Sequence, residues 1–591
     1  MPIDPVDPAL RHRAVAAAQG AEPFDLLLAG GTLVDVGCGE LRAADVGFVG
    51  PLVASVHEPG ARADALDALD CSGRFVAPGL IDLHVHFESS MLTPGAYAEA
   101  VCPRGTTTVF ADPHELANVA GVKGVRYAVE ASRGLPVRFI VQAPSCVPPQ
   151  PGLELSGADL FGPDVERMLR WPEVGGLAEV MDMLGVLSSD DRMSAVVAAG
   201  LASGKLVSGH AAGLTGPALQ GYLAAGITSD HEIFTEPDCL EKLRAGMTVE
   251  LRGALDAILP SIVEEVNRLP IPPTHLVAAT DDLFALTLLE DGGLDHLLRR
   301  LIAHGMDPVL AFRCATYHAA YRLQRVDLGA VVAGRQADVI VLDSLDDVAV
   351  NEVFVGGRMV AAGGRMLHGV VDGPSDRPLD TMHLTPMVAD DFRLRLDAPD
   401  GQHRMRVIAD AVMTRWDETT VTVRSGVVDV PAGHLVQVTV HRHGRIDPTP
   451  HAALLAGWGD WTGAIATTVA HDTHNLVVFG RDADDMAVAA NIVIASGGGV
   501  AVVRDGEVLA AIELPIAGIL SPLPARDVAA AQRAVQDAAV GVGLSSDTLV
   551  VTQPLFQVML SSLACLPGPH VTDVGLIDGT TGELVATALI S

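Results

Sequence analysis

The sequence predicts an α/β protein built around a (β/α)₈ barrel, with a small composite β-sandwich domain beside it and a C-terminal α+β domain after it. Short apolar runs alternate with helix-like segments between residues 76 and 324, as expected of parallel strands joined by helices. Runs broken by Gly, Asp and Pro at residues 24–75 and 325–380 predict the β domain. Strands and helices are mixed in residues 385–591. A chain of 591 residues is too long for one hydrophobic core, so several domains are expected.

The barrel prediction depends on a count of strand-like runs. Each run is short and apolar, ends in polar or charged residues and precedes a helix-like segment. Eight such units are typical of a closed barrel, in which catalytic groups stand at the carboxyl ends of the strands. We place the strands at 81–87, 106–111, 138–143, 176–181, 205–210, 226–231, 247–252 and 275–281. A leader helix rich in Ala and Arg is expected within residues 1–23.

Composition narrows the class of protein and its partners. With 49% hydrophobic and 19% charged residues the chain is globular, and its formal net charge of −34 argues against nucleic acid or an anionic membrane as partner. The N-terminus lacks a secretory pattern, and we find no apolar run long enough to span a bilayer. The seven scattered cysteines indicate free thiols in a reducing compartment. We therefore expect a cytoplasmic protein, and a homo-oligomer because symmetric assemblies are common.

The strongest local signal is the segment PGLIDLHVHFESS, which contains His84 and His86. Residues two apart on a strand point to the same face. At the mouth of a barrel, both imidazoles could therefore bind one metal ion. A buried pair of hydrogen-bonded core histidines is the alternative, and the strand ends downstream weigh against it.

Four further metal-ligand candidates end other predicted strands. They are Glu179, His210, His231 and Asp281. A pair of divalent ions needs an anionic bridge, which a carboxylated lysine often supplies in barrels of this kind. The only lysines are Lys123, Lys205 and Lys242, and none is well placed. Glu179 lies on the required fourth strand, so the sequence favours a glutamate bridge.

Several segments together resemble the adenine deaminase family of the amidohydrolase superfamily. In the barrel they are APGLIDLHVHFESSMLTP (77–94), RGTTTVFADPHELANVAG (104–121), GLAEVMD (176–182), SGHAAGLTG (208–216), AGITSDHE (225–232) and TDD (280–282). After it they are AVVAGRQADVIVLD (330–343), AHDTHNLVVFG (470–480), GGGVAVVRDGEV (497–508) and LPIAGILS (514–521). The pair HVHFESS and FADPHE is specific to this family, whereas a bare HxH is common to the superfamily. The resemblance covers roughly residues 24 to 585.

The resemblance implies hydrolytic deamination of adenine to hypoxanthine and ammonia. It implies two divalent metal ions, most often manganese or iron and also zinc, at His84, His86, Glu179, His210, His231 and Asp281. In that chemistry a metal-bound hydroxide attacks C6 of the base. Asp281 takes the proton and passes it towards the leaving ammonia. Glu232 or Glu115 is a second acid that could protonate N1.

Other polar residues near the strand ends are candidates for binding the base. Asp112 and His114 follow the second strand, and they would line the pocket or support the metal ligands. The remaining candidates are Glu88, Ser89, Arg252 and Asp282. The segment at 471–475 has no role that chemistry alone assigns, so a structural or subunit-contact role and closure of the active site both stay open.

Three departures from the family pattern leave open a substrate other than adenine. Arg252-Gly253-Ala254-Leu255 lacks an expected acid, Leu283 replaces an arginine, and the segment 292–295 lacks a histidine. Such loops are expected to face substrate. An N6-substituted adenine, or another cyclic amide or amidine, would suit the same chemistry. A second possibility is a cyclic-amide hydrolase of the dihydropyrimidinase or imidazolonepropionase kind, for which a lysine bridge would be expected. A third is a catalytically weakened paralogue that acts as a binding protein, for which lost metal ligands would be expected. Metal analysis of the purified protein would separate this third possibility from the enzymes.

Overall fold

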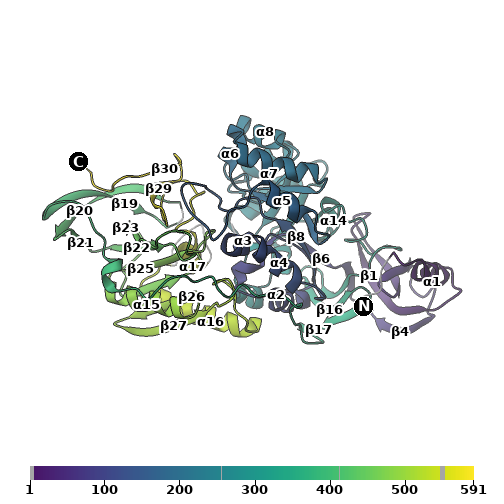
Figure 1. The fold of residues 1–591 in the computed structure, drawn as a ribbon. Coiled ribbons are helices and arrows are strands. Elements are labelled where there is room, and N and C mark those ends of the chain that lie inside the picture. The colour runs from purple at the N-terminus through teal and green to yellow at the C-terminus, as the bar shows by residue number, and fades with distance from the viewer. Residues whose placement is uncertain (1–5, 254–255, 412, 546–552, 591) are drawn as a thin grey trace.

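A computed structural model describes residues 6–253, 256–411, 413–545 and 553–590. In Figure 1 the chain has three parts in a row, with a TIM-like α/β barrel in the middle. An N-terminal β-sheet lies on one side of the barrel and a C-terminal α/β region on the other. The N-terminal helix α1 (Pro8–Ala18) begins after Asp7, whose carboxylate accepts from the Ala9 amide. Within the described ranges, every helix is too short or too polar to cross a lipid bilayer.

All eight predicted barrel strands are present and parallel. They are β6 (Leu80–His86), β7 (Thr106–Ala111), β8 (Arg138–Ala143), β9 (Val174–Val180), β10 (Leu206–Gly209), β11 (Ser229–Asp230), β12 (Thr248–Arg252) and, as an interrupted eighth strand, β13 (Leu276–Ala279) with β14 (Asp281–Asp282). Residues in β6 and β7 are buried throughout, as expected where both faces of a parallel sheet are covered.

The hydrogen-bonded strands form two arcs. One arc has the order β10-β9-β8-β7-β6-β14, and the other has β11-β12-β13. Pairing of Asp281 with Val85 brings β14 beside β6, so the last strand meets the first. At the other seam, the Thr228 amide donates to the Val207 carbonyl at 3.2 Å. The strands thus curl into a barrel-like ring whose weakest connection lies between β10 and β11.

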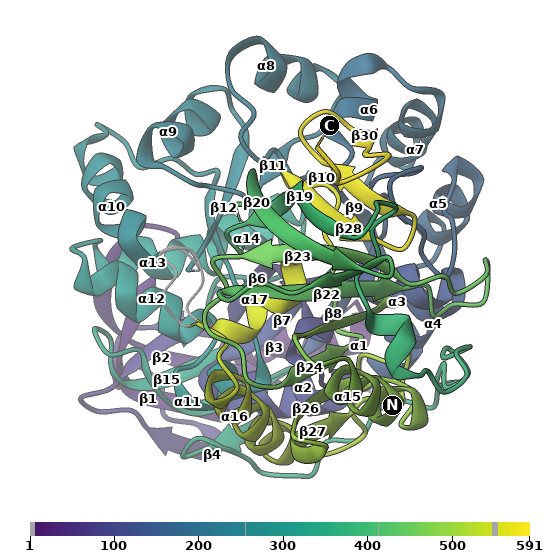
Figure 2. The same cartoon turned by 90° about the vertical axis from the view of Figure 1, so that its left-hand side faces the viewer.

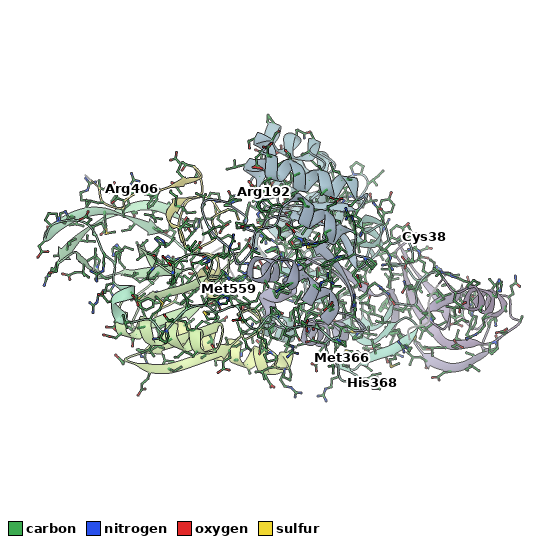
Figure 3. The ribbon with its side chains drawn as sticks, viewed as in Figure 1. Cys38, Arg192, Met366, His368, Arg406 and Met559 are labelled. Atoms are coloured by element: carbon green, nitrogen blue, oxygen red, sulfur yellow. The ribbon has the colours of Figure 1, made fainter. Side chains whose placement is uncertain are left out.

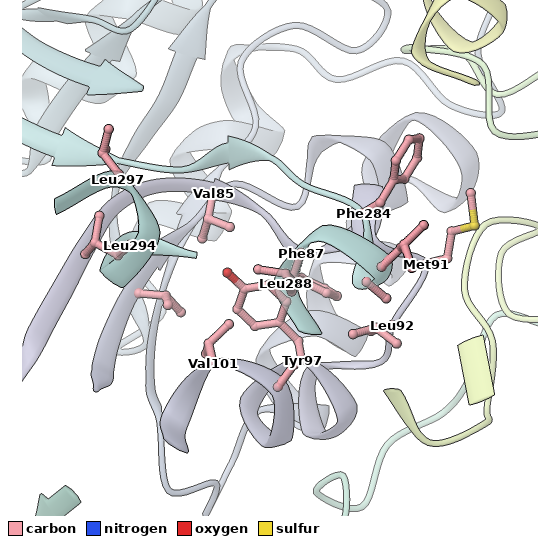
Figure 4. Close-up of a cluster of buried hydrophobic side chains, with 14 of the residues drawn as sticks. Val85, Phe87, Met91, Leu92, Tyr97, Val101, Phe284, Leu288, Leu294 and Leu297 are labelled. Atoms are coloured by element: carbon pink, nitrogen blue, oxygen red, sulfur yellow. The ribbon is translucent and has the colours of Figure 1, made fainter. Parts of the chain in front are cut away.

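Helices cover the outside of this ring (Figure 2). They include α2 (Pro94–Val101), α4 (Val122–Ala131), α5 (Gly162–Leu169), α7 (Asp191–Ala202), α8 (Gly216–Ala224), α9 (Glu236–Arg244), α10 (Leu259–Arg268) and α12 (Leu294–Ala303). Shorter helices are α3 (His114–Ala120), α6 (Met183–Ser188), α11 (Ala285–Glu290), α13 (Pro308–Cys314) and α14 (Tyr317–Arg322). Side-chain caps mark several starts, for example Thr235 before α9. Phe87, Tyr97 and Leu288 belong to the buried hydrophobic cluster shown in Figure 4.

Segments before and after the barrel join in one nine-stranded sheet. Its path is β18-β17-β16-β15-β5-β1-β2-β3, with β4 paired to β1. The first five strands are β1 (Phe24–Asp35), β2 (Glu40–Val49), β3 (Leu52–His57), β4 (Ala65–Asp70) and β5 (Phe75–Pro78). The later four are β15 (Val339–Ser344), β16 (Ala349–Val355), β17 (Arg358–Ala362) and β18 (Arg365–Met366). Antiparallel pairing of β5 with β15 joins the two segments.

The C-terminal region contains a second nine-stranded sheet, ordered β21-β20-β19-β23-β22-β25-β24-β26-β27. Its strands are β19 (Gly401–Ala409), β20 (Arg415–Arg424), β21 (Val427–Asp429), β22 (His434–Val440), β23 (His451–Ala456), β24 (Ala464–Thr467), β25 (Leu476–Gly480), β26 (Gly499–Arg504) and β27 (Glu507–Glu513). Three helices accompany it, namely α15 (Ala483–Ala495), α16 (Ala525–Gly541) and α17 (Pro554–Leu560). A small sheet follows, made of β28 (Pro569–Thr572), β29 (Gly575–Asp578) and β30 (Glu583–Leu584).

This region packs against the carboxyl end of the barrel. Gln532 on α16 accepts from the Leu286 amide at 2.9 Å and donates to the Ser90 carbonyl at 3.1 Å. Phe284 and Phe556 stack with ring centroids 4.5 Å apart. Within the C-terminal region, the carbonyl of Met559, which is labelled in Figure 3, accepts from the His471 amide at 2.9 Å. The contacts place C-terminal residues beside the strand ends.

Candidate active site and metal centre

His84 and His86 point to the same face of β6, as their spacing predicts. Their Nε2 atoms are 2.9 Å apart, and both side chains are buried. Nδ1 of His86 lies 3.0 Å from the Asp112 carbonyl oxygen, to which it can donate. That hydrogen bond favours the tautomer whose Nε2 carries a free electron pair, which is the form that binds a metal ion.

Carboxylates from two other strands complete a group of donors around these nitrogens. Oδ1 of Asp281 is 3.4 Å from His84 Nε2 and 3.3 Å from His86 Nε2. Oε1 of Glu179 is 3.8 Å and 3.2 Å from the same two atoms. Donors about 2.0–2.2 Å from one cation lie roughly 3–3.5 Å from each other, so this spacing suits a single ion. We call this group the first subsite.

The other oxygen of Glu179 faces a second group of donors. Oε2 is 2.8 Å from His210 Nδ1 and 3.3 Å from His231 Nε2. We call these three residues the second subsite. One carboxylate thus presents its two oxygens to two separate histidine pairs, which is the arrangement expected of a bridging ligand. Lys205 lies elsewhere, because its ammonium donates to backbone carbonyls that include those of Leu169 and Trp171.

The chemistry of the donor set fits metal ions. Two imidazole nitrogens 2.9 Å apart can share at most one proton, and buried carboxylates need a balancing positive charge. All six candidate ligands take part in buried His, Asp and Glu groups whose ligand atoms lie within 4.8 Å of one another. Asp112 and His114 join one of these groups with His86 and Glu179. Both residues therefore belong to a donor group that could hold a metal ion, in addition to their predicted place near the base.

Nearby histidines and an arginine keep the two candidate acidic ligands ionised. Burial alone would raise the pKa of Glu179, but the neighbouring His231 and the hydrogen bond from His210 hold it well below its usual range. Burial would also raise the pKa of Asp281, but the Arg252 guanidinium together with the surrounding histidines holds it well below its usual range. Both carboxylates are therefore anionic at neutral pH.

Arg252 joins two of the residues predicted to be catalytic. Its guanidinium hydrogen-bonds Asp281 Oδ2 through Nη1 and Glu232 Oε2 through Nη2, the latter at 2.7 Å. Burial raises the pKa of Glu232 above its usual value. Asp281 therefore faces the metal-binding nitrogens with one oxygen and the arginine with the other. Glu232 is held beside it.

The residues predicted to bind the base lie around the same strand ends. Ser89 donates to Asp282, and His114 Nδ1 is 3.0 Å from Asp112 Oδ2. Oε1 of Glu88 accepts weakly from the Leu116 amide at 3.5 Å. Burial raises the pKa of Glu88 to about 8. These side chains follow β6 and β7 or lie on β14, the strands that carry His84, His86 and Asp281 or lie beside them.

The C-terminal region reaches this site through the segment whose role the sequence left open. His474 Nε2 bonds Oε2 of Glu115, and His471 Nδ1 is 2.6 Å from its Oε1. Both histidines are buried, and the charge of His471 helps to hold the pKa of Glu115 well below normal despite its burial. The segment thus contacts an acid beside the candidate site, and its role in closing that site stays a prediction. The pairing spans more than 350 residues, so local pattern could not reveal it.

Glu250 is another buried acid that the sequence analysis missed. Its Oε2 lies 3.9 Å from His84 Nδ1 and 4.0 Å from His231 Nδ1, on the far side of both rings from the donor groups. Burial raises its pKa to about 7. The signal was present in the sequence, because Glu250 and Arg252 are two apart on β12 and share the inward face.

The altered loops differ in how they relate to the site. Arg252 is in the site, whereas residues 254 and 255 lie outside the described residues. Asp295 accepts from the Gly293 amide at 2.9 Å and pairs with Arg104 and Arg299. Arg104 precedes β7, whereas Gly293 lies near Thr280, which directly precedes Asp281. The expectation that segment 292–295 faces substrate stays a prediction.

Comparison with known proteins places the chain in a class. A sequence model of the amidohydrolase family matches residues 75–360, and one of the adenine deaminase C-terminal domain matches residues 411–583. An adenine deaminase of Klebsiella pneumoniae (strain 342) is 52% identical, covering 98% of this chain and 95% of its own. Adenine deaminase 2 of Rhizobium meliloti (strain 1021) is 48% identical, covering 100% of this chain and 98% of its own. An adenine deaminase of Moorella thermoacetica is 38% identical over 97% of each chain.

The TIM-like barrel and its histidine- and carboxylate-rich mouth define an amidohydrolase. The full-length relatives narrow the class further. The chain belongs to the adenine deaminase family. The resemblance predicted from HVHFESS and FADPHE is thereby confirmed.

Proposed function

We propose that this protein catalyses the hydrolytic deamination of adenine to hypoxanthine and ammonia, using two divalent metal ions. The ions would be held by His84, His86 and Asp281 at the first subsite and by His210 and His231 at the second, with Glu179 between them. The observation that carries the proposal is the carboxylate of Glu179, whose two oxygens face different histidine pairs. Family membership supplies the substrate class.

The bound ions would lower the pKa of a water molecule so that hydroxide is available at neutral pH. Asp281 is placed to accept the proton of the attacking water, because one of its oxygens faces the metal donors. As the C6–O bond forms and the C6–N bond breaks, Asp281 returns that proton to the departing ammonia. Arg252 keeps the carboxylate oriented during both transfers.

Two further acids are candidates for contact with the bound ring. Glu232 has a raised pKa, which suits a group that donates a proton or hydrogen bond to N1. Glu115 is the alternative, and it is held by contacts with His471 and His474. Glu88, Ser89, Asp112, His114 and Asp282 would line the remaining wall of the pocket.

Finer features extend this proposal. We propose manganese or iron as the native metal, with zinc possible, because His, Asp and Glu donors accept all three. We also propose a cytoplasmic homo-oligomer. Its domains would divide at residues 24–75 with 325–380, at 76–324 and at 385–591. The two nine-stranded sheets on either side of the barrel support this division.

Ammonia release is the decisive experiment. Manganese-, iron- and zinc-loaded protein would be tested with adenine, N6-methyladenine, guanine, cytosine and their nucleosides. We expect hypoxanthine and ammonia from adenine. N6-methyladenine would release methylamine in place of ammonia, so both amines would be measured. Methylamine from N6-methyladenine alone, or ammonia from another base alone, would replace adenine as the substrate, and release of neither amine from any of these compounds would overturn the deaminase assignment.

A further inference from the structure

Lys242 is a buried cation that the chemistry above does not use. It lies on α9 with its side chain fully buried. Its Nζ is 2.7 Å from Asp230 Oδ2 and 2.8 Å from Asp238 Oδ1, and it donates to the Glu232 carbonyl at 2.8 Å. The ammonium therefore makes one hydrogen bond and two ion pairs, and these three acceptors match its three N–H groups in number.

The partner carboxylates hold the backbone on both sides of the second subsite. Oδ1 of Asp230 accepts from the Ala211 amide at 2.6 Å and from the Glu232 amide at 3.2 Å. Ala211 directly follows the ligand His210, and Glu232 directly follows the ligand His231. Oδ2 of Asp238 accepts from the Phe234 amide at 3.2 Å. One ion-pair network therefore joins the two chain segments that carry the second pair of histidines.

This network lies where the barrel needs support. The strand before His231, β11, comprises only two residues, whereas β6 and β9 have seven each. The two hydrogen-bonded arcs also end at β10 and β11, so regular strand pairing does not connect the carboxyl ends of these neighbours. Strand geometry alone therefore constrains His210 and His231 less than it constrains His84 and His86.

We propose that Lys242 is a positioning residue for the second metal subsite, holding His210 and His231 at the spacing that Glu179 needs. The inference rests on the proposed metal centre. Residue type supports it, because lysine is rare here, with three among 39 basic residues. A compact ammonium can serve three acceptors that converge on one point, whereas the planar guanidinium fork of arginine cannot.

Lys205 offers a matched control in the same barrel. Its ammonium is also fully engaged, donating to the carbonyls of Leu169, Trp171 and Val174. It precedes β10, at the end of the strand opposite His210. Removing either lysine deletes three polar contacts, but only Lys242 connects to residues beside metal ligands.

The test compares Lys242→Met with Lys205→Met. Apoprotein prepared by chelation would be titrated with Mn²⁺, and bound metal per chain would be measured by elemental analysis. For Lys242→Met we expect one of two ions to bind about ten- to a hundredfold more weakly, as is typical when a residue supporting metal ligands is lost. Activity should fall as that ion is lost, and it should return when excess Mn²⁺ is added. Lys205→Met should lower the thermal midpoint but retain two ions with wild-type affinity.

Two outcomes would overturn the inference. One is wild-type affinity for both ions in Lys242→Met, whatever its thermal stability. The other is an equal loss of metal in Lys205→Met, since that would indicate general loosening of the barrel. Should Lys242→Met not fold, Lys242→Arg keeps the charge and should still weaken one ion; wild-type affinity there would also refute the proposal. This test can be distinguished from a failure of the proposed function. If wild-type protein binds two ions but releases no ammonia from adenine, the proposed function fails, and the metal titration of the variants can still be read.

Discussion

Replacing His474 by glutamine should slow the reaction although the residue lies outside the barrel. His474 bonds Oε2 of Glu115, and both side chains are buried. A hydrogen bond to a buried charge contributes about 1.5–3 kcal/mol. Each 1.36 kcal/mol in the barrier is tenfold in rate. Because His471 still pairs with the other oxygen of Glu115, we expect the lower part of this range, about a ten- to thirtyfold loss of kcat/KM for adenine.

The assay is ammonia release by metal-loaded enzyme, with metal content measured alongside. His570→Gln is the control, because His570 is also buried in the C-terminal region and contacts a backbone carbonyl, that of Ser561, at 3.2 Å. Both variants should lower the thermal midpoint, and both should retain two metal ions. If His474→Gln keeps kcat/KM within about twofold of wild type, the contact between His474 and Glu115 has no part in catalysis.

Three other perturbations test separate parts of the site and fold. Glu179→Gln removes the charge that faces both histidine pairs, so metal content should fall from two ions per chain to one or none by elemental analysis, and two tightly bound ions would contradict a bridge. Asp281→Asn should reduce kcat by at least about a hundredfold if Asp281 moves the proton, and activity that survives both this change and chelation would refute the mechanism. Burial lowers the pKa of His318 to about 4, because it disfavours the charged imidazole. The stabilising contribution of the neutral imidazole is complete above about pH 6.5 and is lost as pH falls towards 4, and the total loss is about 3 kcal/mol. His318→Gln should therefore flatten the acid side of the urea-denaturation profile, and an unchanged slope would contradict the shift.

Much of the candidate site could be predicted because a strand alternates its side chains. The HxH spacing placed His84 and His86 on one face, and the polar residues at successive strand ends predicted ligands that the structure brings together. The same rule could have found Glu250, two residues before Arg252. The role of the loop at 292–295 stays a prediction, because a departure from a family pattern does not say what the loop contacts in the fold.

By itself the sequence determined the family, the barrel strands and the residues able to bind metal, since these depend on short-range periodicity and residue chemistry. Only the tertiary structure decided which distant side chains share one buried space. The contact of Glu115 with His474 depends on how the C-terminal region docks on the barrel. The support that Lys242 gives to Asp230 depends on how α9 returns to the strand ends. Such contacts are set by packing between elements, and packing leaves no period in the sequence.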